Sequence, residues 1–480
     1  MYPLQRVHFE KIDQKSVNPH FSPSPALQQL LSGKALLLDE LNEFVSILGI
    51  HYENGYIGYK EAISIRKGSP YCNRCGTTEP FHFYNHQCAK CNQMCTYCRN
   101  CIMMGKMQSC AKLVVWTGII HPFPSRQNPL HWKGQLSEGQ KTASDMVIET
   151  IRAKETCLVW AVCGAGKTEV LFEGIAVSIA KGERVCIATP RTDVVLELAP
   201  RLRKVFPTTS IAALYGGSEE KNVYAQLIIS TTHQLLRYER AFDTIIVDEV
   251  DAFPYSMDKS LQFAVAKSLK DISSLIFLTA TPSTQLQKAA FSKKLKYVTI
   301  PARYHRHPIP IPQLKWLGNW KKSFSKNVIP YALHQWFKQK LQYKIPFLIF
   351  FPNIELMNKH LPLFQKEYPI LEAVHAEDPD RKAKVQRLRN KQTLGLLTTT
   401  ILERGVTIPK LHVAVVGAEE DIFTESALVQ IAGRVGRSAD CPTGEVIFFH
   451  YGRTRAMIRA MKQIKSMNVE ARKKGLIYDE

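Results

Sequence analysis

The stretch AVCGAGKTEV, residues 161–170, directly follows the apolar run CLVW and contains the consecutive residues Gly166, Lys167 and Thr168. A buried strand that leads through a turn of small residues into a helix presents backbone N–H groups and a helix N-terminus to phosphates. In such a loop Lys167 neutralises phosphate charge and Thr168 ligates magnesium. We therefore predict a P-loop for a nucleotide with Mg²⁺, although Ala161 replaces the first glycine of the usual pattern. The predicted nucleotide-binding residues are Ala161, Val162, Cys163, Gly164, Ala165, Gly166, Lys167 and Thr168.

A pair of acidic residues further along supplies the second half of such a site. In TIIVDEVDAF, residues 244–253, an apolar strand ends in Asp248 and Glu249. Two carboxylates at the end of a strand suit nucleotide hydrolysis, with Asp248 holding magnesium through water and Glu249 polarising the attacking water. The alternative is an acidic turn without chemistry.

Apolar runs and helical stretches alternate around these motifs in two blocks. The first block contains LVWAVCGAGKT, RVCIATPRT, QLIISTTHQLL, TIIVDEVDAF and LIFLTATP, and the second contains PFLIFFPN, GLLTTTILERGV, VAVVGA and EVIFFHYG. This alternation is the pattern of parallel sheets in α/β domains. The basic, proline-rich segment PARYHRHPIPIPQLKWLGNWKK between the blocks is predicted to be a hinge.

Length and charge limit the function further. With 480 residues and 45% hydrophobic content, the chain can form two or three globular units, so disorder of the whole chain is excluded. Its 63 lysines and arginines exceed its 42 acidic residues, and the resulting net charge of +21 favours a polyanionic partner such as nucleic acid or an acidic membrane face. The N-terminal sequence does not resemble a signal peptide, and no apolar run approaches the roughly 18–20 residues of a membrane span. We expect a cytoplasmic protein.

Eight of the twelve cysteines lie between Cys72 and Cys110. The knuckles YCNRCG (71–76) and TYCRNCI (96–102) each place two thiolates on one tetrahedral ion, for which Zn²⁺ is the default. A structural role is expected, because an all-thiolate site leaves no open position for a substrate. Eight thiols are enough for two nested sites, but spacing does not fix which cysteines pair. The predicted ligands are Cys72, Cys75, Cys98 and Cys101, with Cys88, Cys91, Cys95 and Cys110 for a second site.

The motifs GAGKT, ATPRTD, TTHQLL, DEVD, TATP, TTTILERGVTIP and QIAGRVGRS stand in the order of those of superfamily 2 helicases of the DEAD/DEAH type, which the chain resembles over about residues 134–455. The resemblance implies two RecA-like lobes with ATP bound between them. It also implies that Arg434 and Arg437 reach the γ-phosphate and that Gln430 aligns with the hydrolytic site. Cations that complete the site only when the lobes close couple hydrolysis to motion. Gln140 resembles the glutamine that reads the adenine edge in such motors.

The same resemblance implies a groove for nucleic acid across both lobes, with contacts to phosphates that carry little sequence information. The candidate DNA-binding residues are Arg191, Thr232 and Thr399, and the alternative for each is a helix cap or a solvated loop. Cations on or beside the knuckles would add phosphate contacts, unless they form only a solvated face and the knuckles dock another protein. These cations are Arg74, Lys90, Arg99 and Lys106.

A cysteine module that precedes a superfamily 2 motor in the same chain points to a particular family within that superfamily. YCNRCG, TYCRNCIMMG, AVCGAGKTE, ATPRTDVVLELAPRL, STTHQLLRY, VDEVDAFPYS and FTESALVQIAGRVGRS together resemble the ComFA family, late competence helicase-like ATPases of Gram-positive bacteria, from about residue 50 to the end. The resemblance implies a motor that brings transforming single-stranded DNA through the entry channel with the competence proteins ComEC and ComFC. It further implies attachment to the inner face of the cell membrane through these partners, and it leaves oligomerisation open.

The chain is thus predicted to be α/β, with two RecA-like parallel-sheet lobes preceded by a small four-cysteine zinc-knuckle module. The predicted parts are an N-terminal segment (1–65) with a helix over residues 25–48, a zinc module (66–112), a linker (113–133), lobe 1 (134–300), a hinge (301–325), lobe 2 (326–455) and a basic C-terminal helix or tail (456–480). Two other functions stay open: a replication-restart helicase resembling PriA, and a zinc-bearing nucleic-acid scaffold with a vestigial ATPase. Against the scaffold, none of Lys167, Glu249 and Arg437 is missing.

Overall fold

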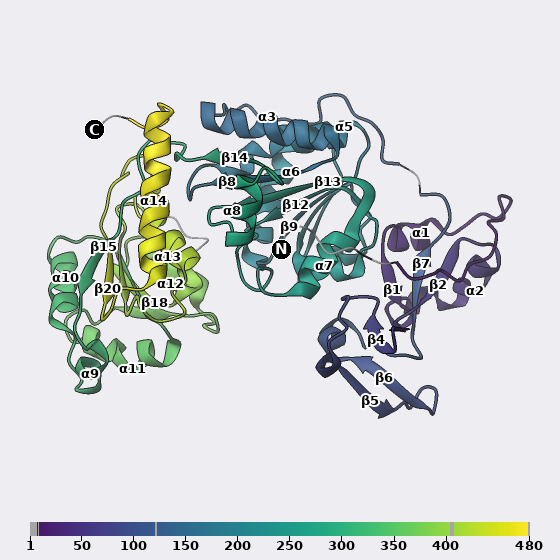
Figure 1. Ribbon diagram of the computed structural model, residues 1–480, viewed down its shortest axis with the longest axis horizontal. Coiled ribbons are helices and arrows are strands. Elements are labelled where there is room, and N and C mark those ends of the chain that lie inside the picture. The colour runs from purple at the N-terminus through teal and green to yellow at the C-terminus, as the bar shows by residue number, and fades with distance from the viewer. Residues whose placement is uncertain (1–6, 8, 121, 404–407, 479–480) are drawn as a thin grey trace. The chain divides into compact units, whose positions relative to one another are not determined.

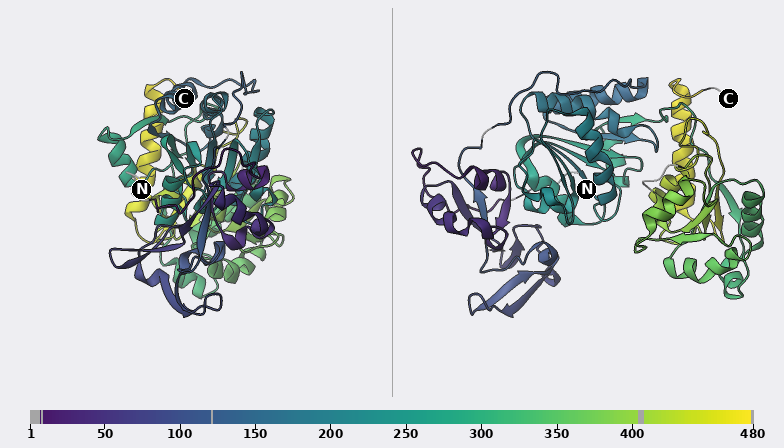
Figure 2. Two further views of the ribbon diagram at one scale, coloured as in Figure 1. Left: turned by 90° about the vertical axis from the view of Figure 1, so that its right-hand side faces the viewer. Right: turned by 180° about the vertical axis from the view of Figure 1, so that it is seen from behind.

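The computed structural model describes residues 7, 9–120, 122–403 and 408–478 (Figures 1 and 2). The chain divides into two compact units. The first unit comprises Met1–Gln135, Ser144–Val159 and Val170–Tyr297, and the second comprises Leu136–Ala143, Trp160–Glu169 and Val298–Glu480. The P-loop therefore belongs to the same unit as the C-terminal part of the chain.

The N-terminal part of the first unit is a three-stranded antiparallel sheet in the order β1-β7-β2, packed with two helices. Its elements are α1 (Pro25–Leu31), β1 (Ala35–Leu37), the 3₁₀ turns η1 (Leu38–Glu40) and η2 (Asn42–Phe44), α2 (Val45–Glu53), β2 (Ile57–Glu61) and β7 (Lys112–Trp116). The single helix predicted over residues 25–48 is wrong. Gly33 adopts φ +71°, which ends the helical path, and the leucines after it pair with β7 instead.

The cysteine module is an insertion between two strands that pair directly, since Ile57 of β2 lies opposite Trp116 of β7. It contains two antiparallel hairpins, β3 (Ile63–Arg66) with β4 (Ser69–Cys72) and β5 (Phe83–Gln87) with β6 (Met94–Cys98). The 3₁₀ turns η3 (Pro80–His82) and η4 (Arg99–Met104) flank the second hairpin. The segment proposed as a linker therefore begins within a strand.

The part of the chain that follows forms a seven-stranded sheet in the order β10-β11-β9-β12-β13-β8-β14. Its strands are β8 (Thr156–Ala161), β9 (Val185–Thr189), β10 (Ile211–Leu214), β11 (Leu227–Thr231), β12 (Phe242–Asp248), β13 (Leu269–Thr279) and β14 (Lys296–Ile300). The accompanying helices are α3 (Glu138–Ala153), α4 (Lys167–Val170), α5 (Phe172–Ala180), α6 (Thr192–Val205), α7 (Lys259–Ser268) and α8 (Thr284–Phe291), with 3₁₀ turns η5 (Glu219–Asn222) and η6 (Thr232–Arg237). Strands β9 and β11 are buried along their whole length, as expected of parallel strands covered on both faces.

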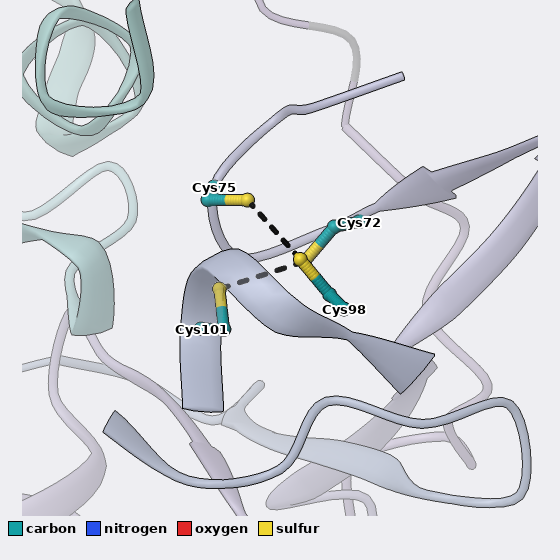
Figure 3. A group of neighbouring side chains, drawn as sticks. All are labelled: Cys72, Cys75, Cys98 and Cys101. Atoms are coloured by element: carbon teal, nitrogen blue, oxygen red, sulfur yellow. Dashed lines mark hydrogen bonds between the residues drawn. The ribbon is translucent and has the colours of Figure 1, made fainter. Parts of the chain in front are cut away.

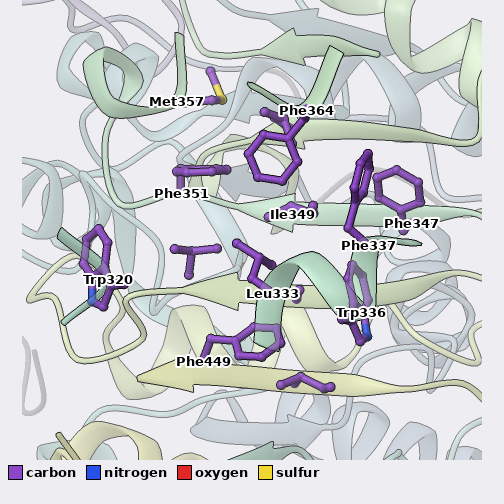
Figure 4. Packing of buried hydrophobic residues seen from close by; sticks show 14 of the residues in the cluster. Trp320, Leu333, Trp336, Phe337, Phe347, Ile349, Phe351, Met357, Phe364 and Phe449 are labelled. Atoms are coloured by element: carbon purple, nitrogen blue, oxygen red, sulfur yellow. The ribbon is translucent and has the colours of Figure 1, made fainter. Parts of the chain in front are cut away.

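The second sheet has six strands in the order β15-β20-β19-β16-β18-β17, and all neighbours are parallel. Its strands are β15 (Gln313–Trp316), β16 (Phe347–Phe350), β17 (Glu372–Val374), β18 (Gly395–Thr398), β19 (His412–Val416) and β20 (Val446–His450). The helices are α9 (Trp320–Ser325), α10 (Tyr331–Gln342), α11 (Ile354–Gln365), α12 (Arg381–Arg389), α13 (Glu425–Ala432) and α14 (Arg455–Lys473), and η7 (Thr400–Glu403) is a 3₁₀ turn. Phe347 and Ile349 of β16 pack with Trp336 and Phe337 of α10 in an aromatic core (Figure 4).

A polar contact also fixes α10 on this sheet. The Glu445 carboxylate accepts hydrogen bonds from the Trp336 indole (2.6 Å) and the Lys340 ammonium (2.7 Å). The His412 Nδ1 atom lies 3.8 Å away, an ion-pair distance. The His412 imidazole, followed by the hydrogen bonds and charge of Lys340 and the Trp336 bond, holds the pKa of Glu445 at about 2 although burial opposes this.

Both sheets confirm the predicted fold class of two RecA-like parallel-sheet lobes behind a cysteine module. The division of the chain into seven parts stays a prediction. Among the described residues, no helix is both long and apolar enough to cross a bilayer.

Candidate active site and metal centres

The P-loop turn depends on two glycines. Gly164 (φ +84°) and Gly166 (φ +70°) adopt left-handed conformations, and α4 begins directly after them at Lys167. A Cβ atom on Gly166 would lie 2.3 Å from Gln140 Nε2, so any other residue would both strain the backbone and displace the Gln140 side chain. Ala161, by contrast, is the last residue of the buried strand β8. The replacement of the first glycine by alanine is tolerated because that position is still in the strand.

Gln140 of α3 holds this loop. Its Oε1 atom accepts from the Ser137 backbone N–H (2.8 Å), and its Nε2 atom donates to the carbonyl oxygens of Ala165 (2.8 Å) and Gly166 (3.3 Å). The side chain is buried. Gln140 therefore orients the P-loop backbone, and its contact with the adenine edge stays a prediction.

The second unit brings the P-loop against α13. The Cys163 thiol donates to Gln430 Oε1 over 3.0 Å, and a Cβ atom on Gly433 would lie 2.5 Å from Cys163 Cβ. Gln430, predicted to align with the hydrolytic site, thus lies beside the nucleotide loop. Arg434 is buried and its Nε donates to the Glu403 carbonyl (2.7 Å), whereas Arg437 is half-buried beyond the end of the helix. The γ-phosphate contacts of both arginines stay predictions.

Sequence reasoning missed Arg303, which lies in the predicted hinge. Its fully buried guanidinium donates to the carbonyl oxygens of Val435 (2.8 Å), Gly436 (2.5 Å) and Gly433 (3.2 Å). Burial lowers the pKa of Arg303 to about 10, so the group is still protonated at neutral pH. One side chain therefore fixes the loop that precedes Arg437. Nothing in PARYHRH distinguishes this arginine from its basic neighbours.

The acidic pair lies at the end of β12 in the first unit. Asp248 is the last residue of the strand and accepts from the Glu249 backbone N–H (2.8 Å). Glu249 has φ +54°, an uncommon left-handed conformation for a non-glycine residue that is often found at functional sites. Asp251, to which the sequence assigned no role, accepts from the hydroxyl groups of Thr279 and Thr281 (2.7 Å to Thr281). Asp251 therefore connects the DEVD motif to the TATP motif through these hydrogen bonds.

The three candidate DNA contacts have different environments. Arg191 is the N-cap residue of α6 and pairs with Asp193 through two hydrogen bonds of 3.0 and 2.6 Å. Thr232 is fully buried, so any contact with DNA would require its backbone. Thr399 is half-buried, and residues 404–407 of the motif TTTILERGVTIP lie outside the described residues. All three roles stay predictions.

Four buried cysteines form the first candidate metal centre (Figure 3). Cys72 ends β4, Cys75 lies in the following turn, Cys98 ends β6 and Cys101 lies in η4. The sulfur atoms of Cys72 and Cys101 are 3.7 Å apart, as are those of Cys75 and Cys98. Tetrahedral zinc with Zn–S bonds of about 2.3 Å requires sulfur separations of about 3.8 Å. The residues therefore fit a structural zinc ion.

The other four cysteines gather in a second group at the far end of the β5–β6 hairpin. The sulfur atoms of Cys88 and Cys110 are 3.7 Å apart, and those of Cys91 and Cys95 are 3.3 Å apart. All four ligand atoms lie within 4.8 Å of one another, so this group also fits zinc. The fold thus brings together two groups of four cysteines that interleave along the chain, because Cys110 of the second group follows Cys101 of the first.

The cysteine module is fastened to the helicase-like domain within the first unit. Arg74, between Cys72 and Cys75, is fully buried and donates to Glu40 Oε2 (2.5 Å). Burial raises the pKa of Glu40, but the Arg74 and Arg237 guanidinium groups outweigh it and hold that pKa below its ordinary value. The buried Lys267 ammonium donates to the carbonyl oxygens of Arg74 and Leu236, each over 2.9 Å. The prediction that Arg74 contacts phosphates is wrong, because its guanidinium is buried in an ion pair.

Two RecA-like sheets, a P-loop and an acidic strand end define a helicase-like, ATP-dependent enzyme of superfamily 2. The family described as DEAD/DEAH box helicase matches residues 141–289, and the helicase conserved C-terminal domain matches residues 330–439. The competence protein ComFA N-terminal domain matches residues 16–115. The chain belongs to the ComFA family of competence-associated proteins.

The similarity to two curated relatives extends over most of each chain. The chain is 48% identical to the competence protein ComFA of Bacillus subtilis over 464 residues, covering 95% of this chain and 98% of that protein. It is 39% identical to ComFA of Streptococcus pneumoniae, covering 85% and 93%. The replication restart protein PriA of Rickettsia conorii is 24% identical over 47% of this chain and 37% of its own length.

A solved structure agrees on the fold. The chain of S. cerevisiae Dbp5 bound to RNA and ADP BeF3 aligns with a TM-score of 0.52 and 17% identity, covering 72% of this chain and 94% of that chain. At this identity the likeness supports the two-lobe fold alone. The helicase family matches imply ATP with Mg²⁺ and nucleic-acid binding for this chain.

Proposed function

We propose that this protein is an ATP-driven translocase that moves transforming single-stranded DNA during natural competence. The observation that carries the proposal is the contact of the P-loop with α13, through Cys163 and Gln430, together with the Arg303 bonds that fix the following loop. A protein that only binds nucleic acid has no need of this arrangement. The vestigial-ATPase alternative is therefore disfavoured.

In the proposed reaction, Lys167 and the backbone N–H groups of the P-loop hold the ATP phosphates. Thr168 and Asp248 would hold Mg²⁺, which when bound neutralises charge on the phosphate oxygens. Glu249 orients and polarises the attacking water. Arg434 and Arg437 stabilise the charge that develops on the transferred phosphoryl group, which makes hydrolysis dependent on the loop that Arg303 holds.

Movement along DNA follows from coupling this site to a groove. The proposed phosphate contacts are Arg191, Thr232 and Thr399. The affinity of these contacts for DNA would rise and fall as the lobes open and close around each ATP. The net charge of +21 supports a polyanionic track. Two structural zinc ions, one in each cysteine group, would hold the N-terminal module in its fold.

The cellular setting is proposed from family membership. The competence proteins ComFC and ComEC are the proposed partners, and attachment to the inner face of the cell membrane would occur through them. A replication-restart role like that of PriA is disfavoured, because the similarity to PriA covers only 47% of this chain.

The test is ATP turnover with and without single-stranded DNA. We expect the wild-type protein to be stimulated, and we expect Glu249→Gln and Arg437→Ala to bind a fluorescent ATP analogue normally but to turn over at least about 100-fold more slowly. Glu173→Gln, at an exposed position of α5, is the matched control and should behave as the wild type. A wild-type rate of ATP turnover that is the same with and without single-stranded DNA would contradict the proposal.

A further inference from the structure

The β5–β6 hairpin, which projects from the rest of the first unit (Figures 1 and 2), carries a pair of aromatic rings, one of which is exposed. Tyr84 and Tyr97 lie directly opposite each other on the two strands, with ring centroids 6.0 Å apart and an interplanar angle of 70°. Tyr84 is 55% exposed and Tyr97 is half-buried. Such cross-strand pairs stabilise hairpins, but an exposed ring also offers a face for stacking.

Each ring lies beside a cation. The Arg99 guanidinium is 5.5 Å from the Tyr84 ring centroid, and the Lys106 ammonium is 4.8 Å from that of Tyr97. Both cations are exposed, and within the described parts of the chain neither forms an ion pair with a carboxylate. These two cations are thus available to a ligand that carries negative charge.

The surrounding segment has basic side chains but no acidic ones. Residues 80–112 contain no aspartate or glutamate. The other two lysines of this segment are neutralised from outside it, Lys90 by Asp39 and Lys112 by Glu61. Arg99 and Lys106 are therefore the two cations of this segment that have no carboxylate partner among the described residues. Unpaired cations interleaved with stacking faces are the arrangement that binds single-stranded nucleic acid.

The end of the hairpin is held by the first cysteine group and, just beyond β6, by a contact with the helicase-like domain. Cys98 lies between Tyr97 and Arg99 and is buried in the first cysteine group, so a metal ion bound by that group would fix the backbone of both neighbours. Asn100 Nδ2 donates to Ser260 Oγ of α7 over 2.7 Å. The same helix bonds to the TTHQLL motif, since Ser268 Oγ donates to the Leu235 carbonyl (3.2 Å). One helix therefore supports both the aromatic pair and a proposed DNA-contact motif.

We propose that Tyr84 and Tyr97 form a base-stacking site for single-stranded DNA, with Arg99 and Lys106 neutralising the flanking phosphates. This inference rests on the proposed function and adds a second point of contact outside the two lobes. Because every base has a stacking face, the site would hold DNA without regard to sequence, as a translocase requires.

The experiment measures the affinity of the full chain for a fluorescent oligothymidine by anisotropy. Stacking contributes enough that Tyr84→Ala should weaken binding by about fivefold or more, while Tyr84→Phe should keep wild-type affinity. An abasic strand of the same length should bind the wild type and Tyr84→Ala equally. Tyr343→Ala, which removes an exposed tyrosine (63%) at the end of α10, is the matched control and should not change affinity.

The cations are tested by the salt dependence of the same binding. Arg99→Gln and Lys106→Gln should each reduce the slope of log affinity against log salt concentration by about 0.7, the value for one phosphate contact on a single strand. Zinc content is measured for every variant, so that loss of affinity through loss of the metal centre is recognised.

Two results would overturn the inference without touching the proposed function. One is wild-type affinity in Tyr84→Ala with zinc content unchanged. The other is normal DNA binding by that variant with loss of binding to phosphatidylglycerol vesicles, which would assign the surface to a membrane. A wild-type protein that binds no single-stranded DNA would instead contradict the proposed function itself.

Discussion

Replacing Arg303 by methionine tests whether one buried side chain controls the catalytic loop. Methionine keeps an unbranched apolar stem but removes the guanidinium that bonds to Gly433, Val435 and Gly436. The three carbonyl groups then lose a charged donor. The loop that leads to Arg437 is expected to leave its position, while the sheet beneath it stays folded.

The size of the effect follows from the bonds. A hydrogen bond from a charged donor contributes about 1.5–3 kcal/mol, and two of the three bonds are short. We take about 3–4 kcal/mol as the free energy that holds the loop, which matches the cost of breaking a buried ionic contact. If Arg437 acts only from the ordered loop, and the loop without these bonds is disordered by this full free energy, kcat falls by up to about 150- to 1,000-fold.

The assay is ATP hydrolysis at saturating single-stranded DNA, with binding of a fluorescent ATP analogue measured in parallel. Binding is expected to change by less than about threefold, because arginines of this kind act mainly in the transition state. Arg306→Met is the matched control, since Arg306 is exposed in the same segment and its guanidinium donates to the Gly475 carbonyl and lies over the Tyr478 ring. A kcat for Arg303→Met within threefold of that control would refute the reasoning.

Three further changes have defined outcomes. Lys167→Ala should abolish ATP hydrolysis and leave the fold and the zinc content intact. Lys181→Ala, at an exposed helix end, is the control and should hydrolyse ATP normally, and near-normal turnover by Lys167→Ala would refute the P-loop assignment. The Cys101→Ala and Cys110→Ala proteins should each bind one zinc ion per chain instead of two, while basal ATP hydrolysis survives. A wild-type protein that binds only one zinc ion would contradict the assignment of the second cysteine group as a zinc centre. Because its folded pKa of about 2 lies below the ordinary 4.5, Glu445 stabilises the C-terminal lobe above pH 4.5. That stability is lost as the pH falls from 4.5 towards 2, so thermal unfolding of Glu445→Gln should depend less on pH in this window, and identical profiles would contradict the assignment.

Local patterns carried the predictions that succeeded. The alternation of apolar strands and helices is enough to predict parallel sheets. Gly164 and Gly166 mark the P-loop turn, because its left-handed backbone conformation favours glycine. Long-range packing explains the failures. The helix over residues 25–48 is broken because Ala35–Leu37 finds a partner in β7, which lies far along the chain.

The groups that sequence reasoning missed depend on the same long-range packing. Arg303 and Asp251 have roles only because the fold brings carbonyl and hydroxyl groups from other motifs to them. Arg74 looked like a surface cation, but the fold buries it against Glu40. The two cysteine groups are the sets that the sequence analysis named, but only the hairpin geometry brings each set of sulfur atoms together, since many pairings satisfy the spacing alone.

Directional movement on single-stranded DNA is the central claim, and displacement of streptavidin from biotin-tagged oligonucleotides measures it most directly. With ATP, the wild-type protein should clear streptavidin from one end of the strand much faster than from the other, and Lys167→Ala should clear neither. ATP hydrolysis stimulated by single-stranded DNA without displacement from either end would contradict the claim.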